Sequence, residues 1–274
     1  MSVDVGEAEA VGSEDLAREA AEFLRNRFAV PSIDLAFVLG SGWSAAADDL
    51  GVEIGRCALP DVPGCARPTV IGHGAILRLV RTSAGKVAAI FTGRTHLYEG
   101  RGIGQVVHPI RAAAAAGAQV LVLTNGSGGL NPRWPAGTPV LIRDHINLTG
   151  STPLVGPRFL DLSEVYSIRL RDLARAVEPG LDEGIYVQFH GPQFETPAEV
   201  RMAGVVGGDL VGMSTALEAI AAREAGLEVL GISLITNLAA GISLTPLSHE
   251  EVLAAGQKAA PRLRTLLAGI SAVL

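Results

Sequence analysis

The chain has 274 residues, of which 48% are hydrophobic, and its 22 Lys and Arg against 28 Asp and Glu give a formal net charge of -6. This length and apolar content predict a sizeable buried core, and the acidic balance without any basic block argues against nucleic acid and anionic membranes as partners. Cys57 and Cys65 lack a C-x-x-C spacing, and neither a signal-peptide pattern nor an apolar run of bilayer length occurs, so we expect reduced thiols in a cytoplasmic protein.

The N-terminal segments predict a helix, then a strand and a glycine turn. Residues 1–12 are small and acidic and are expected to form a flexible tail, after which Ser13 can cap the first helix. The apolar run at residues 34–39 is typical of a buried strand, and Gly40-Ser41-Gly42 leads from it into a second helix. Such a turn presents the Ser41 hydroxyl and backbone N–H groups to an anion, although a purely structural turn fits equally well. The G-x-G-x-x-A pattern also keeps a dinucleotide-binding fold open.

A glycine- and proline-containing loop is expected at residues 51–75, and it carries His73 between two glycines. The flanking glycines suit a mobile lid over an anion, although most loop histidines have no function. The apolar runs at residues 76–80 and 86–91, joined through Ser83-Ala84-Gly85, predict a β-hairpin. The sheet is therefore predicted to be mixed, which counts against a pure dinucleotide-binding fold.

Polar groups gather directly after the second hairpin strand, where Arg94, His96 and Tyr98 alternate. In extended backbone, residues two apart share a face, so these three side chains are expected to project together. A guanidinium, an imidazole and a phenol suit a phosphate beside a sugar. The competing interpretation is an ion-paired strand end at the surface, with Glu99 nearby.

A further strand end of the same kind is predicted in the middle of the chain. A helix at residues 105–116 precedes a buried strand at 120–124, and the strand leaves through the glycine-rich segment that contains Gly126. Ligands of α/β sheets bind at the carboxyl ends of strands. We therefore expect the strand ends at Ser41, Arg94 and Gly126 to converge on one anion site.

The C-terminal half continues with strands at residues 140–144, 185–189 and 228–236. A loop at residues 150–159 is long enough to be functional or to reach a neighbouring subunit. No linker or repeat interrupts the pattern, so a single domain at residues 13–274 is predicted. The six histidines are scattered without an H-E-x-x-H spacing, which argues against a metal site.

Two helix starts in this half carry polar residues of interest. Thr196, Pro197 and Glu199 predict a capped helix, and Glu195 just before it is free either to face a pocket or merely to complement the helix dipole. Ser248 is expected to cap the C-terminal helix, with His249 in its first turn.

Met213 and Asn237 have ordinary structural interpretations as well as functional ones. Met213 lies between a short strand and a helix at residues 216–225, where core packing is its commoner role. Asn237 follows the last strand, and its amide can donate and accept at once, as reading a purine edge requires, although Asn is more often a turn residue.

Taken in order from about Leu35 to the C-terminus, these motifs together resemble the trimeric, low-molecular-mass purine nucleoside phosphorylases. The motifs that carry the resemblance are Gly40-Ser41-Gly42, Gly93-Arg94-Thr95-His96-Leu97-Tyr98-Glu99-Gly100, Thr124-Asn125-Gly126-Ser127-Gly128-Gly129-Leu130, Asp144-His145-Ile146-Asn147-Leu148, Gly191-Pro192-Gln193-Phe194-Glu195-Thr196, Val211-Gly212-Met213-Ser214-Thr215, Thr236-Asn237 and Ser248-His249-Glu250-Glu251. Two departures are visible: Gly126-Ser127 stands where the family often has Ala-Ala, and the stretch from Asn237 to His249 is shorter than in some members.

The resemblance implies a single α/β domain with a mixed central sheet flanked by helices, and a homotrimer. It implies a pentosyltransferase that uses inorganic phosphate as cosubstrate, with no cofactor and no metal. The implied reaction is the reversible phosphorolysis of 6-oxopurine ribo- and deoxyribonucleosides, inosine and guanosine among them, to the free base and the (deoxy)ribose 1-phosphate, in purine salvage.

The resemblance also implies a role for each motif residue. The implied phosphate ligands are Ser41, Arg94, His96, the backbone N–H of Gly126, Ser214 and, on a closing loop, His73. The implied ribose contacts are Tyr98, Met213, His249 and, from the adjacent subunit, Phe159. The implied purine contacts are Phe194, Glu195 and Asn237, and the implied catalytic residues are Asn237, Glu195 and His96.

Chemistry connects these implied roles. Breaking the glycosidic bond develops positive charge on the sugar and negative charge on the base. Donation from Asn237 to N7 and acceptance by Glu195 from N1–H would both strengthen toward that transition state. An amide at position 237 favours a 6-oxo over a 6-amino purine, and His249 favours a 5′-hydroxyl over a methylthio group. The alternatives are a methylthioadenosine phosphorylase, a non-catalytic purine or phosphate binder, and a dehydrogenase with a dinucleotide-binding fold.

Overall fold

The computed structural model describes residues 5–70, 74–243 and 246–274, with side chains from Gly12 onward. Its strands are β1 (Leu35–Val38), β2 (Val52–Ala58), β3 (Ile76–Arg81), β4 (Val87–Phe91), β5 (Val120–Gly129), β6 (Pro139–Asn147), β7 (Asp182–Gln188), β8 (Leu210–Gly212) and β9 (Glu228–Leu238). Its α-helices are α1 (Val5–Phe28), α2 (Ile103–Ala115), α3 (Ile168–Val177), α4 (Pro197–Val205), α5 (Ala216–Glu224) and α6 (His249–Val273), and its 3-10 helices are η1 (Ser44–Asp49), η2 (Leu59–Asp61) and η3 (Leu97–Glu99).

The strands form one mixed sheet in the order β2-β3-β4-β1-β5-β8-β7-β6-β9. The predicted hairpin is confirmed, because β3 and β4 pair antiparallel. β1 runs parallel to both β4 and β5, and β5 runs parallel to β9, so the carboxyl ends of these strands lie at one edge. β9 also pairs with β6, which closes β5, β8, β7, β6 and β9 into a ring.

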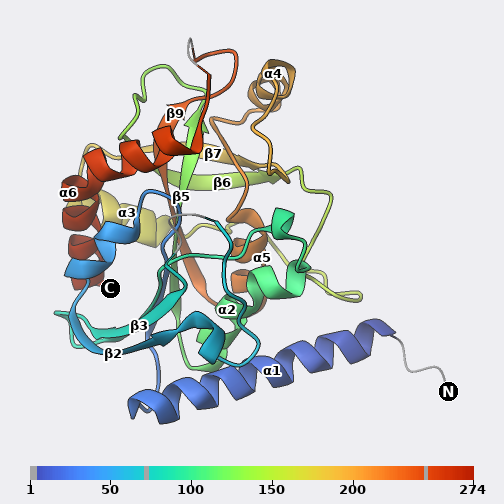
Figure 1. The fold of residues 1–274 in the computed structure, drawn as a ribbon, viewed down its shortest axis with the longest axis vertical. Helices are drawn as coiled ribbons and strands as arrows, with labels where there is room; N and C mark the ends of the chain where they lie inside the picture. Colours follow the sequence, from blue (N-terminus) through green and yellow to red (C-terminus); the bar gives the residue numbers. More distant parts are fainter. Residues whose placement is uncertain (1–4, 71–73, 244–245) are drawn as a thin grey trace.

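Helices cover both faces of the sheet, as the fully buried β1 requires (Figure 1). Leu35 and Phe37 pack into the core shared with α3 and α6, whereas Ala36 and Val38 pack into the core shared with α1 and α2. Successive strand side chains point to opposite faces, so a strand with a helix layer on each side has no polar position. The predicted single α/β domain with a mixed, helix-flanked sheet is confirmed.

Three local expectations are wrong. α1 begins at Val5 rather than at Ser13, because the Glu and Ala residues of the acidic segment are strong helix formers. The division into a tail and a domain stays a prediction, and residues 1–4 lie outside the described part. Residues 52–58 form β2 rather than loop, paired antiparallel with β3. The turn after β1 leads into the short 3-10 helix η1 rather than an α-helix, so it lacks a full helix dipole.

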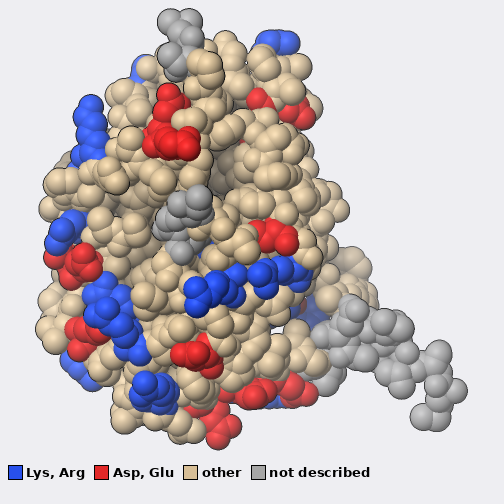
Figure 2. Space-filling view, in the orientation of Figure 1, with Lys and Arg blue, Asp and Glu red and all other residues tan. Residues whose placement is uncertain are grey.

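Charges of both signs are dispersed over the face drawn in Figure 2, where the described basic and acidic side chains are interspersed rather than gathered by sign. Among the described residues, no helix combines the length and apolarity needed to span a bilayer.

Close backbone packing holds the turn that follows β1. Gly42 has φ +84°, a left-handed conformation that favours glycine, and α6 crosses it at Gly256. A Cβ on Gly256 would lie 2.3 Å from the Gly42 Cα, and a Cβ on Gly40 would lie 2.6 Å from the Thr124 carbonyl oxygen. The turn is therefore clamped between α6 and β5, which fixes the position of Ser41.

We expect Gly256→Ala to destabilise the protein by about 1–3 kcal/mol, because backbone cannot yield to the added methyl group. Denaturant unfolding measures this change. The matched control is Gly104→Ala in α2, where a Cβ meets no atom within 4 Å and stability should rise by up to about 1 kcal/mol. Equal free energies of unfolding for the two variants would show that the backbones at Gly42 and Gly256 can move apart at little cost.

Candidate active site

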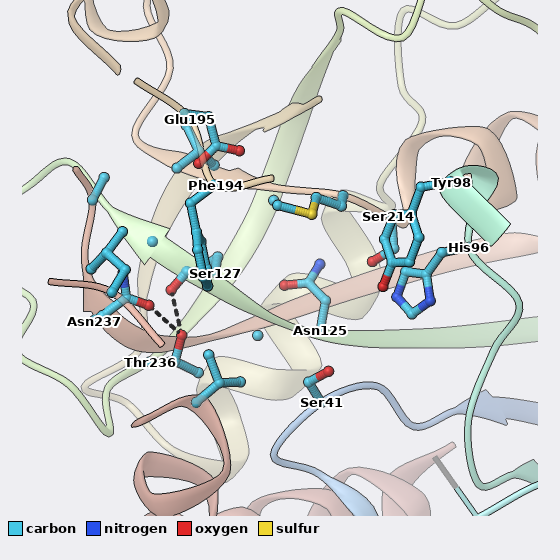
Figure 3. Close-up of a pocket in the computed structure, with 18 of the residues that line it drawn as sticks. Ser41, His96, Tyr98, Asn125, Ser127, Phe194, Glu195, Ser214, Thr236 and Asn237 are labelled. Atoms are coloured by element: carbon cyan, nitrogen blue, oxygen red, sulfur yellow. Dashed lines mark hydrogen bonds between the residues drawn. The ribbon is translucent and has the colours of Figure 1, made fainter. Parts of the chain in front are cut away.

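A cavity of about 680 Å³, its open mouth included, lies at the edge of the sheet where β1, β4 and β5 end (Figure 3). Ten of the predicted site residues line it: Ser41, Arg94, His96, Tyr98, Gly126, Phe194, Glu195, Met213, Ser214 and Asn237. The predicted convergence of strand ends is thus observed, and a volume of this size suits a small-molecule ligand.

Arg94 provides the fixed positive charge of the cavity. Its side chain is 3% exposed, and its Nε donates to Glu218 Oε1 at 2.9 Å while Nη1 donates to the Thr124 carbonyl at 2.6 Å. The absence of a side chain at Gly40 makes room for the guanidinium, since a Cβ there would lie 2.4 Å from Nη1. A buried ion pair with this many contacts leaves the guanidinium little freedom to move.

His96 and Tyr98 form the wall beside Arg94 (Figure 3). Their rings stack with centroids 4.8 Å apart. Burial lowers the pKa of His96, which favours the neutral imidazole near pH 7. His96 and Tyr98 do project together, but the predicted reason is wrong for Tyr98, which lies in η3 rather than in extended backbone.

Glu99 holds this wall in place, but the competing interpretation of an ion-paired surface strand end is wrong, because Arg94 and His96 are buried. Arg94 pairs with Glu218 rather than Glu99. Glu99 Oε1 accepts the His96 backbone N–H at 2.7 Å and lies 3.4 Å from His96 Nδ1. Its Oε2 accepts from the backbone and the hydroxyl of Thr69. Although burial raises the pKa of Glu99, the hydrogen bonds from His96 and Thr69 lower it to about 2, so the carboxylate stays ionised.

Glu195 lies on the opposite wall of the cavity, with Phe194 (Figure 3). Thr196 and Glu199 form the predicted capping box of α4 with each other, so the helix start does not need Glu195. The Glu195 side chain is 8% exposed, and burial raises its pKa. Within the described part of the chain, its Oε1 has no hydrogen-bond partner. A buried carboxylate oxygen without a donor is costly, which indicates that a ligand supplies the donor.

A β-bulge turns Asn237 toward the cavity. The register of β9 against β5 shifts at Thr236, so that Thr236 and Asn237 both line the cavity rather than alternating. Asn237 Oδ1 accepts from the Thr236 hydroxyl at 2.8 Å, and Nδ2 donates to the Leu238 carbonyl at 3.0 Å (Figure 3). The amide therefore keeps a second hydrogen and a second lone pair.

Two of the described predicted residues, Phe159 and His249, do not line this cavity. Phe159 is 98% exposed on its loop, and His249 begins α6 two residues after Leu247, which does line the cavity. His73 lies outside the described residues. The roles implied for these three stay predictions.

Several lining residues were missed by sequence reasoning, among them Asn125, Ser127 and Thr236. The sequence predicts that Asn125 and Ser127 belong to a strand exit and Thr236 to a strand, yet β5 continues through its glycines to Gly129. The available signal was polarity, because a buried strand that carries Asn and Ser needs hydrogen-bond partners. Among the described residues, no group of three or more His, Cys, Asp or Glu is arranged to hold a metal ion.

Comparison with known proteins gives consistent matches. The family model of the phosphorylase superfamily matches residues 34–272. The chain is 58% identical over 260 residues to a purine nucleoside phosphorylase of a Cellulomonas species, covering 93% of this chain and 92% of that protein. It is 52% identical over 259 residues to the purine nucleoside phosphorylase of Mycobacterium tuberculosis, covering 94% and 96%.

A solved structure also matches. Isoform 2 of the purine nucleoside phosphorylase from Schistosoma mansoni, in complex with cytosine and ribose-1-phosphate, superimposes with a TM-score of 0.85 at 32% identity. The match covers 95% of this chain and 96% of that chain.

We expect Glu218→Gln to lower the free energy of unfolding by about 3–5 kcal/mol, because it leaves the Arg94 charge buried without its carboxylate. Urea unfolding at pH 7 measures the loss. The control is Asp49→Asn, which removes an exposed ion pair with Arg264 and should leave stability unchanged within error. A loss no larger for Glu218→Gln than for the control would contradict the interpretation of Arg94 as a desolvated charge.

Glu195→Gln should stabilise the protein near neutral pH. The pKa of Glu195 is raised in the folded state, so folding disfavours the ionised carboxylate. The free energy of unfolding of the wild type therefore falls as the pH rises from the ordinary carboxyl pKa through the folded pKa. The higher free energy of unfolding of Glu195→Gln relative to the wild type should therefore disappear at acid pH, below the ordinary carboxyl pKa. Unfolding curves of both proteins from pH 4 to pH 8 test this, and a gain independent of pH would count against it.

Proposed function

The chain belongs to the purine nucleoside phosphorylases of the phosphorylase superfamily, and on this premise we propose that it catalyses the reversible phosphorolysis of 6-oxopurine nucleosides. Inosine and guanosine, with ribose or deoxyribose, are the proposed substrates. The products are the free base and the (deoxy)ribose 1-phosphate, as in purine salvage.

The observation that carries the proposal is the Glu195 Oε1, which no donor of the described residues reaches and which shares a cavity with Arg94. An ionised carboxylate accepts hydrogen bonds only, and a 6-oxopurine carries a hydrogen on N1 where a 6-aminopurine has a lone pair. The second amide hydrogen of Asn237 is suited to N7. Both contacts gain strength as negative charge develops on the departing base.

The opposite end of the cavity suits inorganic phosphate. Arg94 supplies the charge, and the hydroxyls of Ser41 and Ser214 and the backbone N–H of Gly126 supply further donors. Neutral His96 carries a single ring hydrogen, so donation to a phosphate oxygen requires the tautomer in which Nε2 is protonated and Nδ1 does not donate to Glu99. Because the protein carries a net charge of -6, such a local cluster is needed to attract an anion.

Catalysis follows from placing these two ends on either side of the sugar. The glycosidic bond lengthens as the base accepts electrons, and the sugar becomes oxocarbenium-like. Phosphate beneath the sugar is both the counter-charge and the nucleophile that attacks the anomeric carbon. Tyr98 and Met213 are proposed to pack against the ribose, with no cofactor and no metal required.

The remaining proposed features concern the assembly. A homotrimer would allow the fully exposed Phe159 to reach a neighbouring active site, while His249 would meet the 5′-hydroxyl and His73 would close over phosphate. We propose a cytoplasmic enzyme.

The test is base release from inosine, guanosine, adenosine and methylthioadenosine, each with and without phosphate. We expect phosphate-dependent release from the first two. Glu195→Gln should lower kcat/KM for guanosine by about 100-fold, because a hydrogen bond to a charged group is worth roughly 1.5–3 kcal/mol. Asn237→Asp should shift preference toward 6-aminopurine nucleosides.

Two of the alternatives have their own outcomes in the same assay. Preference for methylthioadenosine over guanosine would refute the assignment of the base. Purine binding without phosphate-dependent release would indicate a binding protein rather than an enzyme.

A further inference from the structure

A continuous chain of buried side chains runs beneath the cavity from Ser127 to Ser214, through Ser233, Asn125 and Thr215. Each of these residues is at most 6% exposed. Figure 3 shows Asn125 between Ser127 and Ser214, so the chain joins the end near Glu195 to the end near Arg94.

The amide of Asn125 sets the direction of the chain, because its two ends have opposite hydrogen-bonding character. Oδ1 can only accept, and it does so from the Ser233 hydroxyl at 2.6 Å. Nδ2 can only donate, and it does so to Thr215 Oγ1 at 2.8 Å. Since the single hydrogen of Ser233 is used on Asn125, the 2.7 Å contact between Ser233 and Ser127 must use the Ser127 hydrogen.

Hydrogen-bond donation continues in the same direction from Thr215 to Ser214, at the end of the cavity near Arg94. Thr215 Oγ1 accepts from Asn125, and its own hydrogen has one acceptor within reach among the described residues, Ser214 Oγ at 3.2 Å. Thr215 is 1% exposed, so an unused hydroxyl hydrogen there would be costly. Thr215 therefore donates to Ser214.

Ser214 is left with a hydroxyl hydrogen that Thr215 does not accept. Its oxygen accepts from Thr215 and, at the limit of a hydrogen bond, from Arg94 Nη1 at 3.5 Å. Among the described residues, the Tyr186 hydroxyl is the one remaining acceptor near the Ser214 side chain, and Ser214 also lines the cavity. Because Thr215 does not take the Ser214 hydrogen, that hydrogen can turn from Tyr186 to an anion in the cavity.

The backbone at Thr215 shows that this arrangement is enforced. Its φ is +84°, which is rare for a β-branched residue. Glu218 accepts the Thr215 N–H at 2.8 Å, and the Tyr186 hydroxyl lies 3.4 Å from the Ser214 backbone nitrogen. Strain of this kind persists only where surrounding contacts fix it, and it is concentrated at functional sites.

We propose that Asn125 and Thr215 are positioning residues that commit the Ser214 hydroxyl to donate to the phosphate cosubstrate. Neither residue touches phosphate in this proposal, and both act through Ser214. The inference rests on the proposed function for the identity of the anion.

The test compares Thr215→Val, which keeps the branched shape without the hydroxyl, with Thr215→Ser, which keeps the hydroxyl. Inorganic phosphate is titrated into each protein by calorimetry, and phosphate and nucleoside KM are measured separately. Thr215→Val should weaken phosphate binding and raise its KM by about 10-fold or more, the worth of one hydrogen bond to a charged group. Nucleoside KM at saturating phosphate should stay within about threefold, and Thr215→Ser should retain tight phosphate binding.

A double-mutant cycle with Ser214→Ala shows whether the effect passes through Ser214. In that background, Thr215→Val should have no further effect on phosphate affinity. Asn125→Asp is the second variant: an acceptor-only side chain takes the Thr215 hydrogen, so Thr215 then takes the Ser214 hydrogen. The loss of phosphate affinity caused by Asn125→Asp should be smaller in the Ser214→Ala background. If Asn125→Asp acted only by charge repulsion, the loss would be the same in that background, and this outcome would overturn the proposal.

The outcomes separate this inference from the proposed function. If the wild-type protein binds phosphate but releases no base, the proposed function fails, and the calorimetry still tests the positioning role. If base release is normal and Thr215→Val binds phosphate as the wild type does, the positioning role is wrong and the function stands. Absence of phosphate binding by the wild type would overturn both.

Discussion

The buried ion pair between Arg94 and Glu218 is the interaction on which the cavity depends. Its two partners come from the end of β4 and the first turn of α5, so it ties the central sheet to a distant helix. Glu218 also accepts the Thr215 N–H, and Arg94 also donates to β5. A buried pair is weak evidence for stability, because desolvation opposes the attraction. Here its contribution is geometric, since one carboxylate fixes both the guanidinium and the strained turn beside it.

The two ends of the cavity favour ligand groups of opposite electrostatic character. Arg94 favours an anion, whereas Glu195 is a buried carboxylate whose pKa is raised by burial. These requirements are compatible if two ligands bind together, a phosphate at one end and a molecule with an N–H donor at the other. Without the N–H donor, Glu195 costs stability, which is the ordinary trade-off between a folded protein and a preorganised site. The net charge of -6 then has little influence on an anion in the cavity, because Arg94 lies close to it and is buried.

Much of the fold and the site was predictable from local signals. The apolar runs predicted β1, β3 and β4, and the capping box at Thr196 and Glu199 is formed as expected. The gathering of Arg94 and Ser41 followed from a general rule about strand ends. The sequence was less informative where pairing with distant strands overrides local preference, as in β2 and in the glycine-rich end of β5.

The sequence by itself determined the residue types that the chemistry requires and the strand and helix starts that carry them, because these depend on neighbours along the chain. Only the tertiary structure decided which of them share a cavity and in which direction their hydrogen bonds run. The bulge that turns Asn237 inward and the amide of Asn125 that orients its neighbours both depend on β5 and β9 lying side by side. That pairing joins residues more than a hundred positions apart, so no local pattern could specify it.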